Sequence, residues 1–210
     1  MLRRILPLLV ICFATALRAQ TFEGIMEFKK MTGTTETDYE YYIKGDKVRI
    51  DEFAPGSRIV SGSFIVDTKA STMKYLLPDR KMWGSRTPKG GLAAPAGAAV
   101  VATKKTKELF GYKCAEQVVT VNADSSKISY WITPGKFNFF MPMLKLLDRQ
   151  ENFSTYYAGI TGLKEGSMPL LAIWTDLKGT EKGRLEVTRL EAKAVNDNMF
   201  AIPSDYTEVK

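Results

Sequence analysis

Few side chains in this sequence could carry out chemistry. The 210-residue chain has no histidine, so a Ser/His/Asp triad, a Cys/His pair and a His-rich zinc site are all excluded. The glycine-containing stretch GSRTPKGG at 84–91 lacks the spacing of a phosphate-binding loop. We therefore predict a protein that is not an enzyme, with no catalytic residue, no metal ligands and no cofactor.

The remaining reactive groups have simpler interpretations. Asp51 and Glu52 are adjacent, and neighbours on a strand point to opposite faces, which disfavours a glycosidase-like carboxylate pair. Cys114 has no histidine nearby to activate it, so we expect a buried, small apolar residue. Asn152 begins the triplet NFS, a glycosylation pattern that often arises by chance.

The first twenty residues, MLRRILPLLVICFATALRAQ, are typical of a secretory signal peptide. Two arginines precede an apolar run from Ile5 to Leu17, and the small residue Ala19 follows. We predict a signal peptide over 1–19, cleavage after Ala19, and a periplasmic or secreted domain over 20–210. The residue pair before Cys12 lacks the small side chain that bacterial lipid modification requires.

The charge of the mature chain disfavours nucleic acid as a partner. Removing three signal arginines lowers Lys+Arg from 30 to 27 against 23 acidic residues, so the net charge falls from +7 to +4. Charges of both signs alternate along the chain, as on an ordinary solvated surface. The apolar stretch at 88–102 is too short for a membrane span, so we predict no transmembrane segment in the mature chain.

Most of the mature chain alternates between apolar and charged residues with period two. In TFEGIMEFKKM, Met26 and Phe28 fall on one side, and in DYEYYIKGDKVRID, Tyr41 and Ile43 do the same. Gly45-Asp46 between two such runs suits a tight hairpin turn. Several short strands that follow one another in this way predict an up-and-down antiparallel sheet.

Two stretches depart from this pattern. PKGGLAAPAGAAVVA, residues 88–102, predicts a flexible loop. FNFFMPMLKLL, residues 137–147, repeats apolar residues at helical spacing and predicts a short amphipathic helix with Pro142 in its first turn.

An apolar sheet face and one short helix leave two interpretations open. The aromatic and aliphatic side chains either pack into a solid core or enclose a partly open cavity, in which flexible residues such as Met26, Met73, Met141 and Met143 adapt to a ligand. The candidate lining residues are Met26, Phe28, Tyr41, Ile43, Phe64, Tyr75, Trp131, Phe137, Phe140, Met141 and Leu144.

Several segments together resemble domain-of-unknown-function family 4412. They are FEGIMEF, YYIKGDKVRID, FIVDTKASTMKYLLPDRKMW, GYKCAEQ, YWIT and LEVTRLEAKAVNDNMFAIPSDY. The family is similar to periplasmic lipoprotein carriers and the related outer-membrane acceptor lipoproteins. This resemblance implies a mainly β fold, in which a strongly curved antiparallel half-barrel carries one or two short helices as a lid. Where the carriers hold their lid with an arginine, this sequence has Lys44.

The resemblance gives two expected functions. The first is a periplasmic binding protein that holds an apolar small molecule, or the acyl chain of a lipid or lipoprotein, between the sheet and the helix. The alternative is an envelope interaction or sensor protein that binds another protein on its concave face. Both rest on fold analogy.

Overall fold

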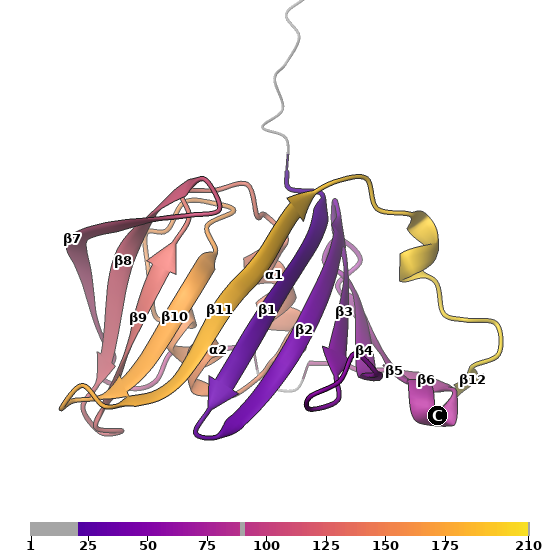
Figure 1. Cartoon of the computed structure of the whole chain (residues 1–210), viewed down its shortest axis with the longest axis horizontal. Coiled ribbons are helices and arrows are strands. Elements are labelled where there is room, and N and C mark those ends of the chain that lie inside the picture. Colours follow the sequence, from indigo (N-terminus) through magenta and orange to yellow (C-terminus); the bar gives the residue numbers. More distant parts are fainter. Residues whose placement is uncertain (1–20, 89–90, 210) are drawn as a thin grey trace, which may run out of the picture.

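The computed structural model describes residues 21–88 and 91–209, and the predicted signal peptide lies outside them. One sheet forms most of the molecule (Figure 1). Its strands are β1 (Gly24–Thr32), β2 (Thr35–Lys44), β3 (Lys47–Phe53), β4 (Val60–Asp67), β5 (Thr72–Leu77), β6 (Met82–Ser85), β7 (Ala99–Leu109), β8 (Tyr112–Val121), β9 (Ser126–Ile132), β10 (Pro169–Asp176), β11 (Glu181–Ala192) and β12 (Thr207–Glu208).

The sheet is open and almost wholly antiparallel. Its 12 strands follow the order β12-β6-β5-β4-β3-β2-β1-β11-β10-β9-β8-β7, and only the short β12 pairs in parallel, with β6. Most neighbours in the sheet are also neighbours in sequence, as expected of an up-and-down sheet. The predicted mainly β, curved and unclosed sheet with short helices is confirmed.

The period-two pattern reappears as rows of side chains across the sheet. Gly45 has φ +57°, which a tight turn requires, and it joins β2 to β3 as predicted. The register then aligns Met26 with Tyr41, Tyr41 with Ile50, and onward through β4 and β5. These rows form the apolar lining of the concave face.

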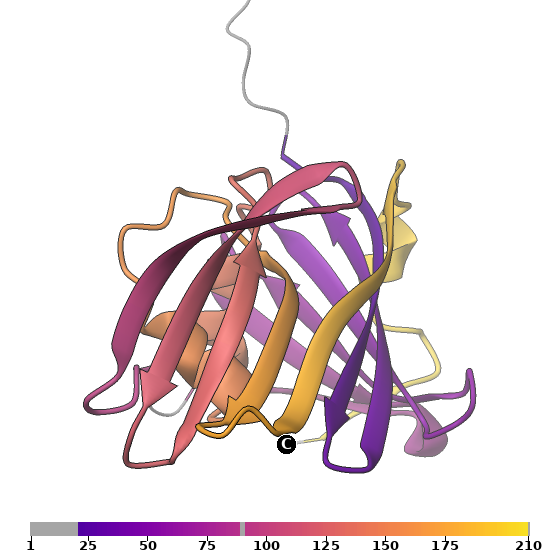
Figure 2. The same ribbon diagram turned by 60° about the vertical axis from the view of Figure 1, so that its left-hand side comes forward.

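Two helices lie inside the curve of the sheet (Figure 2). The first, α1 (Phe140–Leu147), begins three residues later than predicted, because Phe137 and Phe139 precede it in a turn. Pro142 falls in its first turn, as expected. The helix ends at Leu147, since Asp148 adopts a left-handed conformation with φ 48°.

The second helix, α2 (Asn152–Ala158), was not predicted from the sequence. Its buried residues Phe153, Tyr156 and Tyr157 repeat with helical spacing, but over only seven residues. Two single-turn 3-10 helices complete the elements, η1 (Pro78–Arg80) and η2 (Asp197–Phe200). Among the described residues, no helix has the length and apolar character needed to cross a membrane.

The Gly/Ala/Pro stretch at 88–102 is only partly a loop. Residues 91–98 have no regular structure, and residues 89–90 lie outside the described part of the chain. Strand β7 begins at Ala99, so the last four residues predicted as loop belong to it. The β-branched pair Val100-Val101 favours this earlier start.

Buried side chains gather into two groups. The first cluster consists of Phe22, Met26, Tyr39, Tyr41, Ile43, Val48, Ile50, Val66, Met73, Cys114, Phe137, Phe139, Met143, Leu147, Met168, Leu170 and Val187. The second cluster consists of Val119, Val121, Ile128, Tyr130, Ile132, Phe153, Tyr156, Tyr157, Ile160 and Ala172. Both clusters lie between the sheet and the segment that carries the two helices.

Candidate ligand cavity

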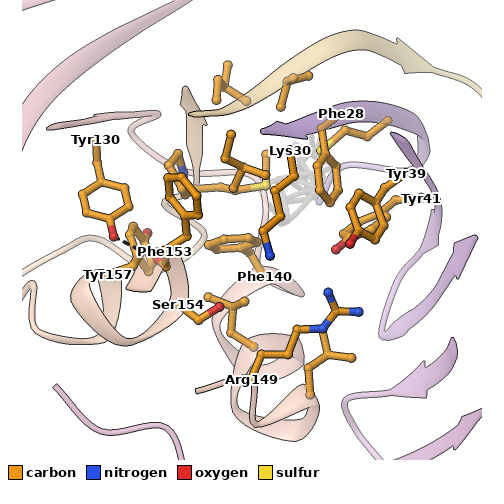
Figure 3. A pocket seen from close by; sticks show the side chains of 18 of the residues that line it. Phe28, Lys30, Tyr39, Tyr41, Tyr130, Phe140, Arg149, Phe153, Ser154 and Tyr157 are labelled. Atoms are coloured by element: carbon orange, nitrogen blue, oxygen red, sulfur yellow. Dashed lines mark hydrogen bonds between the residues drawn. The ribbon is translucent and has the colours of Figure 1, made fainter. Parts of the chain in front are cut away.

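A narrow cavity of about 60 Å³ lies between the concave face and the helices (Figure 3). Its lining consists of Met26, Phe28, Lys30, Tyr39, Tyr41, Tyr130, Phe140, Leu144, Leu147, Arg149, Glu151, Phe153, Ser154, Tyr157, Met168, Pro169, Leu170, Leu185 and Val187. These residues come from both clusters and from the partly buried side chains that pack on them. The cavity therefore lies where the two clusters meet.

One wall is formed by β1 and β2. Phe28 stacks on Tyr39 with ring centroids 4.9 Å apart and meets Tyr41 edge to face at 4.6 Å. The antiparallel register places Phe28 opposite Tyr39 and Met26 opposite Tyr41. Burial raises the pKa of Tyr41, so its hydroxyl stays protonated at physiological pH.

The opposite wall is formed by β9, α1 and α2. The Tyr157 ring contacts Tyr130 at 5.5 Å and Phe140 at 5.4 Å, both edge to face. The Tyr130 hydroxyl donates to the Phe153 carbonyl at 2.9 Å, and the Tyr157 hydroxyl donates to the Ser167 carbonyl at 3.1 Å. Because these hydroxyls are satisfied by the backbone, the wall presents mainly ring surface to the cavity.

The mouth of the cavity is charged. Lys30 from β1 forms an ion pair with Glu151, just before α2. Arg149 lies between the helices, with its guanidinium 5.7 Å from the Tyr39 ring centroid and 5.5 Å from that of Phe64. Such cation–π contacts fix the guanidinium at the rim.

The two cations at the mouth have shifted pKa values. Burial lowers the pKa of Lys30, and the nearby Arg149 charge lowers it further. Burial alone would lower the pKa of Arg149 as well, but the adjacent tyrosines and Glu52 outweigh it and raise the pKa overall. Arg149 is therefore a permanent cation beside an apolar cavity.

The sequence matches one family over most of its length. Residues 22–206 match the family described as Domain of unknown function (DUF4412). The chain belongs to the DUF4412 family. The family expected from the sequence is thus confirmed, and no curated protein matches the chain.

Several solved structures are similar to this DUF4412 chain at low sequence identity. An uncharacterised conserved protein from Thermus thermophilus is 12% identical, with 89% of this chain and 90% of that chain covered and a TM-score of 0.50. A chain of the Pseudomonas aeruginosa MucA/MucB complex is 13% identical, with coverage of 88% and 57% and a TM-score of 0.47.

A third structure is a domain from Vibrio parahaemolyticus described as a candidate outer membrane lipoprotein-sorting protein. It is 10% identical, with 84% of this chain and 87% of that chain covered and a TM-score of 0.33. Of these three likenesses, only that to the Thermus thermophilus protein reaches a TM-score of 0.50, and at 12% identity it concerns the fold alone.

The DUF4412 structure brings only part of the predicted lining together. Met26, Phe28, Tyr41, Phe140 and Leu144 line the cavity. They come from two adjacent strands and the helix, as the period-two and helical patterns predicted.

Other candidates lie elsewhere. Ile43 and Phe137 are fully buried in the first cluster and do not line the cavity. Phe64 and Tyr75 border a separate hollow over β4 and β5, and Met141 borders another beside Pro142.

Tyr130, the neighbour of Trp131 on β9, lines the cavity, and Trp131 does not. Tyr130 is 1% exposed, whereas Trp131 is half-buried, with the Lys107 ammonium 4.9 Å from its ring centroid. Adjacent strand residues point to opposite faces, so only one of the two aromatics can face the helices. The alternation in the sequence favours Tyr130, because it falls with Ile128 and Ile132, whereas Trp131 falls with Ser129 and Thr133.

The position implied by the carrier resemblance has a different role in this DUF4412 protein. Lys44 Nζ lies 3.0 Å from Asp197 Oδ1, so it contacts η2 in the C-terminal segment instead of the helices. Arg149 instead reaches from the helical segment to the sheet aromatics. Arg149 was not among the predicted lining residues, because DRQE at 148–151 is typical of a solvated helix end.

Proposed function

We propose that this protein is a non-enzymatic binding protein of the cell envelope that holds an apolar chain, such as the acyl chain of a lipid or lipoprotein. The observation that supports it most directly is the apolar cavity between the sheet and α1. Ligand pockets are typically concave, mostly apolar and furnished with a few polar groups. The predicted signal peptide supports the envelope location.

The size of the cavity sets a condition on this function. One water molecule needs roughly 10–15 Å³ on the same measure, so 60 Å³ is too small for a long acyl chain. A chain can enter only if α1 moves away from the sheet. A helix of eight residues has little stability of its own and depends on its packing. Met26 and Met168 in the walls can change rotamer to fit a chain.

An uncharged fluorescent probe tests the binding function. N-phenyl-1-naphthylamine should become fluorescent on entering the cavity, and dodecanol should displace it. Leu144→Trp fills the cavity from α1 and should weaken probe binding by about tenfold or more, because the larger side chain occupies the volume that the probe needs. Lys145→Trp is the matched control, because Lys145 is exposed on the same helix.

Native mass spectrometry gives an independent measurement. Protein purified from its own cells should retain lipid, and the Leu144→Trp variant should retain less. The alternative, an envelope protein with a packed interior whose concave face binds another protein, predicts neither probe fluorescence nor retained lipid. Equal probe binding by the Leu144→Trp and Lys145→Trp variants would contradict the proposed site.

A further inference from the structure

Two cations converge at the mouth of the cavity. Figure 3 shows the Lys30 ammonium and the Arg149 guanidinium pointing into the same space, beside the Tyr39 and Tyr41 rings. They come from β1 and from the segment between α1 and α2, which lie far apart in sequence. Both side chains are half-buried.

The carboxylates near the mouth do not balance these cations equally. Lys30 pairs with Glu151, whose side chain remains 31% exposed. Within residues 21–88 and 91–209, Arg149 has no ion pair with a carboxylate, and its neighbours are the Tyr39 hydroxyl and the rings of Tyr39 and Phe64. Glu52 lies opposite Tyr39 in the sheet register and acts on both cations at longer range.

The two cations would stabilise an anion that binds between them. The Arg149 charge already lowers the pKa of Lys30, so the two cations repel each other at this site. A guanidinium presents two parallel N–H groups to a carboxylate or phosphate, and such charge-assisted hydrogen bonds are strong. The rings of Tyr39 and Phe64 hold that fork in place.

We propose that the ligand is a single-chain amphiphile with an anionic head, a carboxylate or a phosphate, held by Arg149 and Lys30 while its tail enters the cavity. This inference rests on the proposed function and adds the chemical class of the ligand. The apolar walls select the tail, and the cations at the mouth select the head.

The test compares three ligands with the same tail, each below its critical micelle concentration and at low ionic strength. Dodecanoate and dodecyl phosphate should displace N-phenyl-1-naphthylamine at concentrations at least about tenfold lower than dodecanol does. The reason is the strength of charge-assisted hydrogen bonds at low ionic strength. Arg149→Met should remove this preference, so that dodecanoate and dodecanol displace the probe at similar concentrations. Lys145→Met, which removes an exposed charge on α1, should keep the preference.

Two further variants separate charge from folding. Arg149→Lys keeps the charge and loses the two-pronged geometry, so the preference should fall to an intermediate value. Glu151→Gln removes the carboxylate that competes for Lys30, so dodecanoate should bind more tightly. Tighter binding is a result that a damaged fold would not give.

Several outcomes would overturn the inference. If dodecanol binds as tightly as dodecanoate, the head site is wrong while the apolar cavity stands. If none of the three ligands displaces the probe and the probe itself does not bind, the proposed function fails as well. If inorganic phosphate or acetate alone matches the affinity of the dodecyl ligand, the site binds a free anion and the assignment to an amphiphile is wrong.

Discussion

The two apolar clusters differ in how their tyrosine hydroxyls are used. In the second cluster, Tyr130 and Tyr157 donate to backbone carbonyls, and Tyr156 lies 2.9 Å from Ser126 Oγ and 2.7 Å from Asp124 Oδ2. In the first cluster, the Tyr39 hydroxyl interacts with Arg149 and Glu52, but the Tyr41 hydroxyl makes no hydrogen bond with any described residue. It lies beside the cavity and the two cations.

This difference indicates that the two clusters contribute differently to the cavity. A buried polar group that is satisfied by the protein fixes a packed core, whereas one left facing a cavity remains available to a ligand. The second cluster therefore forms a wall of the cavity whose hydroxyls are already used by the protein, through Tyr130 and Tyr157. The first cluster forms the wall that leaves the Tyr41 hydroxyl free for a ligand.

The largest expected effect is on the packing of the second cluster. Tyr156 is fully buried, and Tyr156→Ala should lower the free energy of unfolding by about 3–5 kcal/mol, as large aromatic truncations do. Val187 belongs to the first cluster and borders the cavity, so Val187→Ala should cost only about 1–2 kcal/mol. Urea unfolding of both variants measures the difference, and equal losses would contradict the different contributions of the two clusters.

The second effect concerns pH and a part of the first cluster away from the cavity. Burial raises the pKa of the fully buried Cys114 thiol to about 11. Between the usual thiol pKa and 11, the unfolded chain loses this proton while the folded protein keeps it, so stability falls as pH rises. The loss should approach about 2 kcal/mol by pH 11.

Cys114→Ala isolates the thiol from the tyrosines that titrate in the same range. The variant keeps every tyrosine, so the difference between the two stability curves reports Cys114 alone. The wild-type curve should fall more steeply from pH 9 to pH 11. If the stability curves of the wild type and the Cys114→Ala variant run parallel, Cys114 is accessible to water, and this part of the first cluster is not a dry core.

The strands of the site were predictable, and the period-two pattern also indicates which face of each strand lines the cavity. Phe28 and Tyr41 alternate with charged residues, and this pattern alone places them on one apolar face. On β9, alternation groups Tyr130 with Ile128 and Ile132, and this apolar face is the one that the structure buries. The predicted lining includes Trp131 against this alternation, because it gives the large aromatic side chain more weight than the position on the strand.

The charged mouth of the cavity was not predictable from the local sequence. Lys30 lies among charged and polar residues near the end of β1, and Arg149 lies in a charged segment after α1. Each has the pattern of a solvent-exposed residue. Only the curvature of the sheet and the return of the chain through α1 bring them to the same cavity.

The smallest expected effect on stability compares single hydroxyl groups across the two clusters. Tyr130→Phe removes the hydrogen bond to the Phe153 carbonyl and should cost about 1 kcal/mol. Tyr41→Phe removes a hydroxyl with no hydrogen bond among the described residues, so stability should change by less than about 0.5 kcal/mol.

Ligand binding should reverse this order. Because the Tyr41 hydroxyl lies near Arg149 and Lys30, Tyr41→Phe should weaken dodecanoate binding while Tyr130→Phe leaves it nearly unchanged. Urea unfolding and probe displacement on the same two proteins provide both measurements. A Tyr41→Phe variant that loses stability without losing affinity would show that the first cluster is an ordinary packed core and that its tyrosine hydroxyl has no part in binding.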